Sequence, residues 1–282
     1  MTRAVLALAA ALLLLPAAGA AQQMREFSSA RQRHGESRLA TRLDFGAGSL
    51  RLAPGPANRL YGLQLVYDVE RFRPISRFDP IAGSVHLGLE STGRSGIRVS
   101  SREHLGQTAV VQLSPSVSLA LDVALGAVDA DIELGGLRIT SLRIGTGASR
   151  STIRFSTPNL APCTAAVIEA GAAEVALSGL GNSRCDRITF SGGVGTALLD
   201  LSGVWASDAQ LDVSMTMGEL TLRLPRTVGV RVEMAKFLSS FAAAGWTREG
   251  DTYLSPGYAT AERKVDISLS TTIGNVNVEW LR

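Results

Sequence analysis

Much of the chain alternates between apolar and polar residues, and the alternation restarts at regular intervals. Five alternating runs each follow a glycine, and these glycines are spaced by 21, 24, 24 and 23 residues: Gly126, Gly147, Gly171, Gly195 and Gly218. Another short apolar run precedes each glycine. The pattern predicts a repeated unit of about 23 residues, made of a strand, a glycine turn, a second strand and a corner.

The phase of the alternation predicts which side chains are buried. A period of two with one apolar face is typical of a half-buried sheet. One unit cannot bury its apolar face alone, but stacked units can. We therefore expect an all-β fold with a β-solenoid over residues 113–282, and a β-sandwich fits the near-constant period less well. The expected interior positions are Val128, Ala130, Ile132, Leu134, Ala173, Val175, Leu177, Ala197, Leu199, Leu201, Leu220, Leu222 and Leu224.

The segments outside the repeat show other patterns. Residues 22–40 are polar without a clear period, which is typical of a flexible leader or a poorly formed helix. Residues 41–112 contain longer amphipathic runs separated by a Pro/Gly loop, and they predict an antiparallel β region flanking the solenoid. Apolar residues at helical spacing predict a short capping helix near 235–244, ended by Gly245.

The N-terminus predicts export. Arg3 is followed by an apolar run over residues 4–15 and by small residues around Ala18 and Ala20, which is the pattern of a cleavable signal peptide over 1–21. The apolar run is shorter than a membrane-spanning helix requires. No cysteine lies near the cut and no later segment is long and apolar enough to span. We expect a mature protein without a lipid anchor or an integral span, in the periplasm or at the cell surface.

Composition and histidine spacing narrow the possible chemistry. The net charge is only +3 and the arginines are scattered without a basic stripe, so we expect no nucleic-acid partner. His34, His86 and His104 lack metal-ligand spacing. The glycine-rich segment 191–200 does not match a dinucleotide-binding motif. We therefore expect no catalytic site, no cofactor and no histidine-based metal site.

Three carboxylates offer the one candidate cation site. Asp129, Asp131 and Glu133 alternate with apolar residues and should therefore point outward from a single strand. They could bind calcium, but calcium sites usually combine carboxylates with loop carbonyls. A solvated acidic face is the favoured interpretation.

The cysteines and tryptophans allow two further hypotheses. Cys163 and Cys185 are the only cysteines, and an exported chain with an even number of cysteines favours a disulfide. Their separation is close to one repeat, which places them on neighbouring strands within bonding reach. Two buried thiols, or a metal pair without other ligands, are the alternatives. Trp205, Trp246 and Trp280 could form a sugar-binding face, although packing in the core or cap is favoured.

The repeat region resembles bacterial toast-rack and adhesin-like β-solenoid domains of unknown function, and it is similar to the C-terminal domain of cell-wall-active antibiotic response regulators. Segments 121–149, 190–205, 217–234 and 271–280 carry this resemblance, with a weaker match over 39–55. The resemblance implies an envelope-associated, non-enzymatic protein. The regulators have membrane helices before this domain, whereas this chain has a predicted cleavable signal.

These observations predict a non-catalytic scaffold or binding module whose partner is another envelope protein or a cell-wall component. A protein that helps to sense envelope stress is the alternative. A carbohydrate-active enzyme would need clustered outward carboxylates, but the outward charged residues are single and mixed in sign: Arg154, Glu174, Asp200, Glu219 and Arg223.

Overall fold

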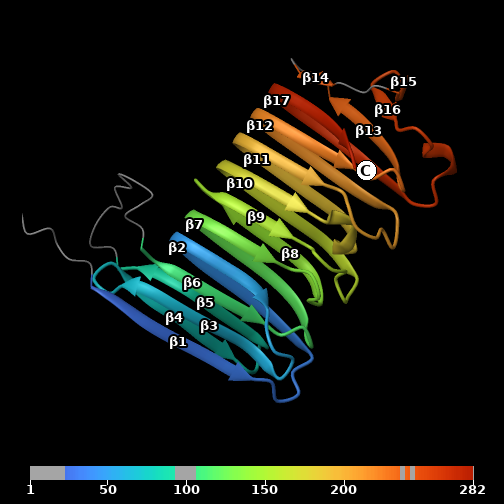
Figure 1. Cartoon of the computed structure of the whole chain (residues 1–282). Coiled ribbons are helices and arrows are strands. Elements are labelled where there is room, and N and C mark those ends of the chain that lie inside the picture. The colour runs from blue at the N-terminus through green and yellow to red at the C-terminus, as the bar shows by residue number, and fades with distance from the viewer. Residues whose placement is uncertain (1–22, 93–105, 236–238, 242–244, 282) are drawn as a thin grey trace, which may run out of the picture.

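The computed structural model describes residues 23–92, 106–235, 239–241 and 245–281, and the strands in these ranges form one 17-stranded sheet (Figure 1). The predicted all-β class is confirmed, since the only helical turns among the described residues are the 3-10 segments η2 (Leu180–Ser183) and η3 (Tyr258–Thr260). The predicted signal peptide over 1–21 lies outside the described residues.

The centre of the molecule is a ladder of parallel strands, stacked side by side in Figure 1. Each step of the ladder is one long strand, or two short strands in line, and is called a rung below. The parallel order along the stack is β2 (Arg38–Pro54), β7 (Ser118–Glu133), β8 (Ile139–Thr146) with β9 (Arg150–Arg154), β10 (Cys163–Ser178), β11 (Cys185–Asp200), β12 (Ala209–Leu224) and β17 (Lys264–Trp280).

Each rung bends near its middle and so has two arms. In β10, residues 165–170 pair with β8, whereas residues 174–178 pair with β9. We call the half before the bend the first arm and the half after it the second arm. Apolar side chains of both arms join one core. All thirteen interior positions predicted from the alternation are buried, which confirms that part of the pattern: Val128, Ala130, Ile132, Leu134, Ala173, Val175, Leu177, Ala197, Leu199, Leu201, Leu220, Leu222 and Leu224.

The bend is formed by a row of glycines, here called the glycine corner: Gly46, Gly126, Gly147, Gly171 and Gly193. A Cβ on Gly193 would lie 2.7 Å from the carbonyl oxygen of Gly171, and the glycines before it stack on one another in the same way. A second row lies two residues further on, where Gly195, Gly218 and Gly274 have φ values of 140°, 138° and 150°.

The predicted alignment of the glycines is therefore partly wrong. Gly195 lies opposite Ala173, and Gly193 is the residue beside Gly171. A shift of two residues leaves every side chain on its predicted face, because the side-chain period of a strand is also two. Gly171 and Gly193 also lie inside continuous strands, so they bend a strand instead of joining two, whereas Gly147 lies between β8 and β9.

Between successive rungs the chain turns around buried asparagines, and this region is here called the asparagine corner. The Asn159 side-chain amide is fully buried, and its two N–H groups are shared among the carbonyls of Ile139, Ala161 and Ser183, which lie 2.8, 2.8 and 3.0 Å from Nδ2. The Ile139 N–H in turn donates to Asn159 Oδ1 at 2.8 Å. In the next rung, Asn182 donates to the carbonyl of Phe155 at 2.9 Å. The amides thus pair backbone groups that the loops would otherwise leave buried and unpaired.

The N-terminal end is a mixed sheet rather than the antiparallel region predicted for 41–112. Its strands are β1 (Met24–Gln32), β3 (Arg59–Asp68), β4 (Phe72–Asp79), β5 (Ser84–Ser91) and β6 (Thr108–Leu113). The β1–β3, β3–β6 and β4–β5 pairs are antiparallel, but β5 and β6 run parallel to β2. The sequence assigns β2 to this region, although its backbone pairs with β7 as the first rung of the ladder.

The leader predicted over 22–40 is wrong for residues 24–32, because β1 is a nine-residue strand there. Its side chains are mostly polar and mostly exposed, so the alternation that marks other strands is weak. The Ser76 hydroxyl donates to Ser29 Oγ at 2.7 Å, and the Arg31 guanidinium carbon lies 4.0 Å from the centre of the Phe78 ring. Side chains of β1 and β4 thus cover the edges of these two strands that have no hydrogen-bonded strand among the described residues. This cover protects the edges from pairing with other chains.

At the C-terminal end, β13 (Gly229–Ala235) and β14 (Ser239–Phe241) cover the two arms of β17. β13 continues into the antiparallel strands β16 (Thr252–Leu254) and β15 (Thr247–Glu249). The capping helix predicted near 235–244 is wrong at residues 239–241, where the edge of β17 offers backbone partners and overrides the helical spacing. Residues 236–238 and 242–244 lie outside the described residues. Among the described residues, no helix is long and apolar enough to cross a membrane.

Candidate functional site

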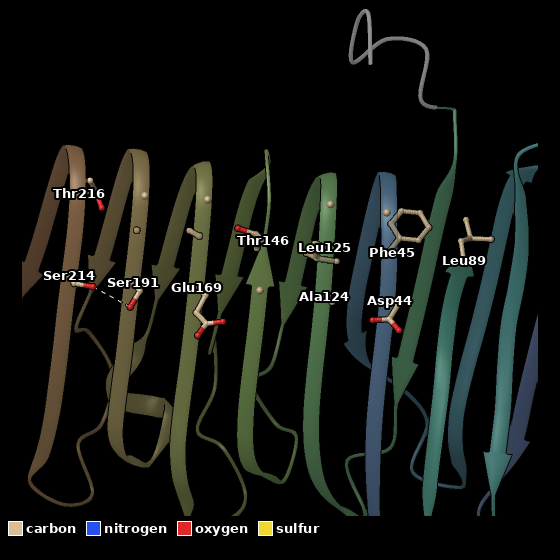
Figure 2. Close-up of a pocket in the computed structure, with 17 residues that line it drawn as sticks. Asp44, Phe45, Leu89, Ala124, Leu125, Thr146, Glu169, Ser191, Ser214 and Thr216 are labelled. Atoms are coloured by element: carbon tan, nitrogen blue, oxygen red, sulfur yellow. Dashed lines mark hydrogen bonds between the residues drawn. The ribbon is translucent and has the colours of Figure 1, made fainter. Parts of the chain in front are cut away.

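A shallow groove of about 930 Å³ crosses the outer side of the first arms beside the glycine corner (Figure 2). We call it the bend groove. It crosses six neighbouring rungs, from β2 to β12, and its lining includes Gly46, Gly126, Gly171 and Gly193. Gly126 and Gly193 have no room for a side chain, because a Cβ on Gly126 would overlap the carbonyl oxygen of Gly46 and one on Gly193 would lie 2.7 Å from that of Gly171. Gly46 has free space, and β12 carries Thr216 at this position. The row of glycines leaves the backbone bare at the bottom of the groove from β2 to β11.

Polar side chains line the groove from the first arms. Figure 2 shows Asp44, Glu169, Ser191 and Ser214 on four different strands, with Ser214 Oγ donating to Ser191 Oγ at 3.2 Å. Glu169 accepts two hydrogen bonds from Arg143 Nη1, at 3.2 and 3.3 Å. The groove therefore presents hydroxyls and carboxylates that arginines already neutralise in part.

Asp44 is the most strongly held of these groups. It accepts a hydrogen bond from Arg42 Nε at 2.9 Å and lies 2.6 Å from His86 Nε2. Burial alone would raise the pKa of this carboxyl, but the hydrogen bonds and charges of Arg42 and His86 outweigh it and lower the pKa. Asp44 is therefore ionised at neutral pH.

An exposed apolar row lies next to the groove, at the outside of the bend. Ala172, Val194, Met217 and Ile273 are in register on four consecutive strands. Val194, Met217 and Ile273 are 53%, 44% and 50% exposed. We call these three residues the outer ridge. A line of large exposed apolar side chains is a common mark of an interaction surface.

Charged side chains of the second arms pair between neighbouring strands. Arg154 contacts Asp131 at 2.6 Å and Glu133 at 3.6 Å, and Asp129 lies in register with Arg150. The three candidate calcium ligands thus each face an arginine of the next rung. This arrangement favours a charged, solvated face over a cation site. Further pairs of this kind are Arg150–Glu174 and Arg223–Glu279.

The two cysteines form a disulfide at the asparagine corner, as predicted. Cys163 and Cys185 open adjacent strands in register, with Cα atoms 4.2 Å apart and a sulfur–sulfur distance of 2.01 Å. The bond joins two consecutive rungs and lies away from the bend groove, since none of the lining residues belongs to that corner.

The structure separates the tryptophans and the histidines that the sequence singles out. Trp205 is buried and its indole donates to the carbonyl of Leu201 at 2.9 Å, whereas Trp246 and Trp280 lie 5.7 Å apart at the C-terminal end. The three rings therefore share no common face. His34 lies in the exposed turn after β1, His86 lies beside the bend groove, and His104 lies outside the described residues.

Sequence comparison assigns the family of this chain. Residues 20–178, more than half of the chain, match the model described as "N-terminal domain of toast_rack, DUF2154". The chain belongs to the toast_rack family. The predicted resemblance to toast-rack domains is thereby confirmed, although the match lies further toward the N-terminus than the segments that suggested it. No curated protein matches this toast_rack chain in sequence.

The solved structures that match the toast_rack chain include two bacterial proteins, of which the first has a similar fold. The first is a "putative cell adhesion protein" from Clostridium sporogenes ATCC 15579, with 16% identity and a TM-score of 0.51 over 92% of this chain and 100% of the other. The other is a "putative adhesin" from Bacteroides fragilis NCTC 9343, with 11% identity and a TM-score of 0.40 over 89% of this chain and 97% of the other.

Proposed function

We propose that this protein is an exported, non-catalytic envelope protein, in which the rungs form a β-solenoid scaffold that binds another envelope protein or a cell-wall component. The observation that carries the proposal is the outer ridge beside the bend groove. Both features extend across consecutive rungs, so a rigid ladder presents an apolar line and a polar groove together. A surface of this kind suits an extended partner better than a small substrate.

Three observations support export to the periplasm or cell surface. The N-terminus has the pattern of a cleavable signal. The Cys163–Cys185 bond suits an oxidising compartment. The Clostridium sporogenes protein of similar fold is described as a "putative cell adhesion protein", and adhesion is one form that the proposed binding can take.

The spacing of the groove carboxylates supports a role without catalysis. Asp44 is on β2 and Glu169 is on β10, with β7 and β8 between them. Three strand spacings separate the two carboxylates by about 14 Å. Glycoside hydrolases that use two carboxylates hold them about 5 to 9.5 Å apart. Asp44 also accepts a hydrogen bond from Arg42 and has a lowered pKa, which favours its ionised form over a general acid.

Cosedimentation with isolated cell envelopes tests the proposal. We expect saturable binding of the chain without residues 1–21, and about tenfold weaker binding when Met217→Ser and Ile273→Ser are combined, since two apolar contacts are lost. Val204→Ser is the control, because Val204 is 67% exposed but lies in the connection between β11 and β12.

Two results would contradict the proposal: no binding above that of an unrelated exported protein, or release of sugar or peptide fragments from the envelopes by the protein. Crosslinking in the same preparation addresses the sensing alternative. Capture of a histidine kinase or a membrane regulator through the outer ridge would assign that role instead.

A further inference from the structure

A second groove, of about 690 Å³, crosses the outer side of the first arms further from the bend. It extends over six neighbouring strands in the order β4, β5, β2, β7, β8 and β10. We call it the arginine trough. Its volume falls within the range of ligand sites, and five strand spacings give it a length of about 24 Å. The trough joins the N-terminal sheet to the first rungs of the ladder.

The trough arises from two neighbouring rows of side chains that run across the strands. The row along its bottom is made of small residues in register: Ser84, Ala40, Ala120, Ser141 and Ala165. Two residues further along each strand, the row along its side is made mostly of long polar residues in register: Arg77, His86, Arg42, Asp122, Arg143 and Val167. Because the side chains of the first row are smaller than those of the second, the surface is lower along the first row, and this forms the trough.

The arginines beside the trough are held in place but keep free donors. Arg42 uses Nε toward Asp44, and Arg143 uses Nη1 toward Glu169. A guanidinium has five N–H donors, so most donors of both groups remain available. Asp122 lies between these two arginines in the row and offers acceptors. Hydrogen-bond donors and acceptors therefore alternate over these three positions, in the middle of the row.

Carboxylates balance the arginines around the trough. Asp79 and Asp122 line it together with Arg42, Arg77 and Arg143. Each of these arginines also pairs with a carboxylate outside the trough: Arg42 with Asp44, Arg77 with Glu90 and Arg143 with Glu169. This balance favours neither a strong anion nor a strong cation. It suits a neutral ligand that supplies both donors and acceptors along its length.

We propose that the arginine trough binds a linear, uncharged glycan. Each sugar hydroxyl both donates and accepts, which matches the alternating side of the trough, and the apolar C–H faces of sugar rings suit the alanine bottom. The length of the trough suits several sugar units in an extended chain. This inference rests on the proposed function, because it names the class of partner that the binding module would take.

Calorimetric titration tests the inference with three uncharged probes: cellohexaose, chitohexaose and mannohexaose. We expect at least one probe to bind the chain without residues 1–21. Ala120→Ile with Ala165→Ile fills the trough and should weaken that binding at least about tenfold. Arg143→Ala should weaken it by a smaller factor, because it removes donors and leaves the shape.

Matched controls lie on the second arms of the neighbouring rungs. Ala176 and Thr152 are half-buried, point outward and are in register with each other, so Thr152→Ile with Ala176→Ile adds similar bulk outside the trough. Arg150→Ala removes an arginine that is paired with Glu174 on that face. Neither control should change glycan binding.

The outcomes separate this inference from the proposed function. Failure of all three probes to bind, or equal loss in the trough and control variants, overturns the glycan inference. Binding of an extended peptide in the trough in place of a glycan overturns it as well. If envelope binding survives Ala120→Ile with Ala165→Ile, the protein is a binding module but the trough is not its binding surface. If the wild-type protein shows no envelope binding at all, the proposed function itself is overturned.

Discussion

The chain turns by opposite means in the middle of a rung and between successive rungs. At the glycine corner the turn is possible because side chains are absent, and the backbone of one strand contacts the next. At the asparagine corner the turn is filled by a buried amide that pairs the loop backbone. The first solution leaves bare backbone at the surface and creates the bend groove, whereas the second leaves a closed corner. In this repeated fold, the glycine corner is therefore open for binding, whereas the asparagine corner contributes stability.

Replacing Asn159 should cause the largest loss of stability. Asn159→Ala removes four buried hydrogen bonds and leaves the Ile139 N–H and three carbonyls without this partner. We expect a loss of about 4 kcal/mol in the free energy of unfolding. Chemical denaturation measures it, with the exposed Asn58→Ala as the control. Equal stability of the two variants would show that the asparagine corner does not hold the rungs.

Removing the disulfide should have the next largest effect. Cys163→Ala with Cys185→Ala releases a loop of 22 residues, which corresponds to about 3 kcal/mol of unfolded-state entropy. Denaturation of the wild-type protein with and without reductant should show the same difference, and the double variant should not respond to reductant. A response of the double variant to reductant would contradict this assignment.

Gly218→Ala tests the second row of glycines, which lies beside the glycine corner. Gly218 has a φ of 138°, and a Cβ there would overlap the carbonyl oxygen of Gly195. We expect Gly218→Ala to cost about 2 to 3 kcal/mol through strain and backbone displacement. Gly145→Ala is the matched control, because Gly145 lies in an equivalent ladder strand with nothing within 4 Å of an added Cβ. Similar stability of both variants would mean that the glycine corner tolerates side chains.

The sequence predicts the two arms better than it predicts how they align. The interior faces follow from local alternation, which is why residues such as Val175 and Leu199 are placed correctly. Register is not local: Gly171 and Gly195 look equivalent in the sequence, yet Gly193 is the true neighbour of Gly171. The outer ridge depends on that register, because Val194, Met217 and Ile273 have no common signal until their strands are aligned.

Segments paired by distant strands are also poorly predicted. β1 is polar and becomes a strand because β3 supplies its partners, and Ser239–Phe241 becomes a strand at the edge of β17. The arginine trough illustrates the same limit at the level of function. Its small and long rows come from six strands spread over residues 40–167, so only the pairing of those strands reveals it.

The smallest predicted effect is a pH dependence of stability that arises from Asp44, on the outer side beside the glycine corner. The pKa of Asp44 is lowered in the folded protein, so its contribution to stability is present above its unfolded pKa near 3.8 and is lost as the pH falls through the lower, folded value. We expect Asp44→Asn to reduce stability by at most about 1 kcal/mol at neutral pH. The difference from the wild-type protein should shrink as the pH falls below about 3.8. Denaturation midpoints measured across this range check the sign. A difference that stays constant with pH would show that the Arg42 and His86 contacts with Asp44 do not stabilise the fold.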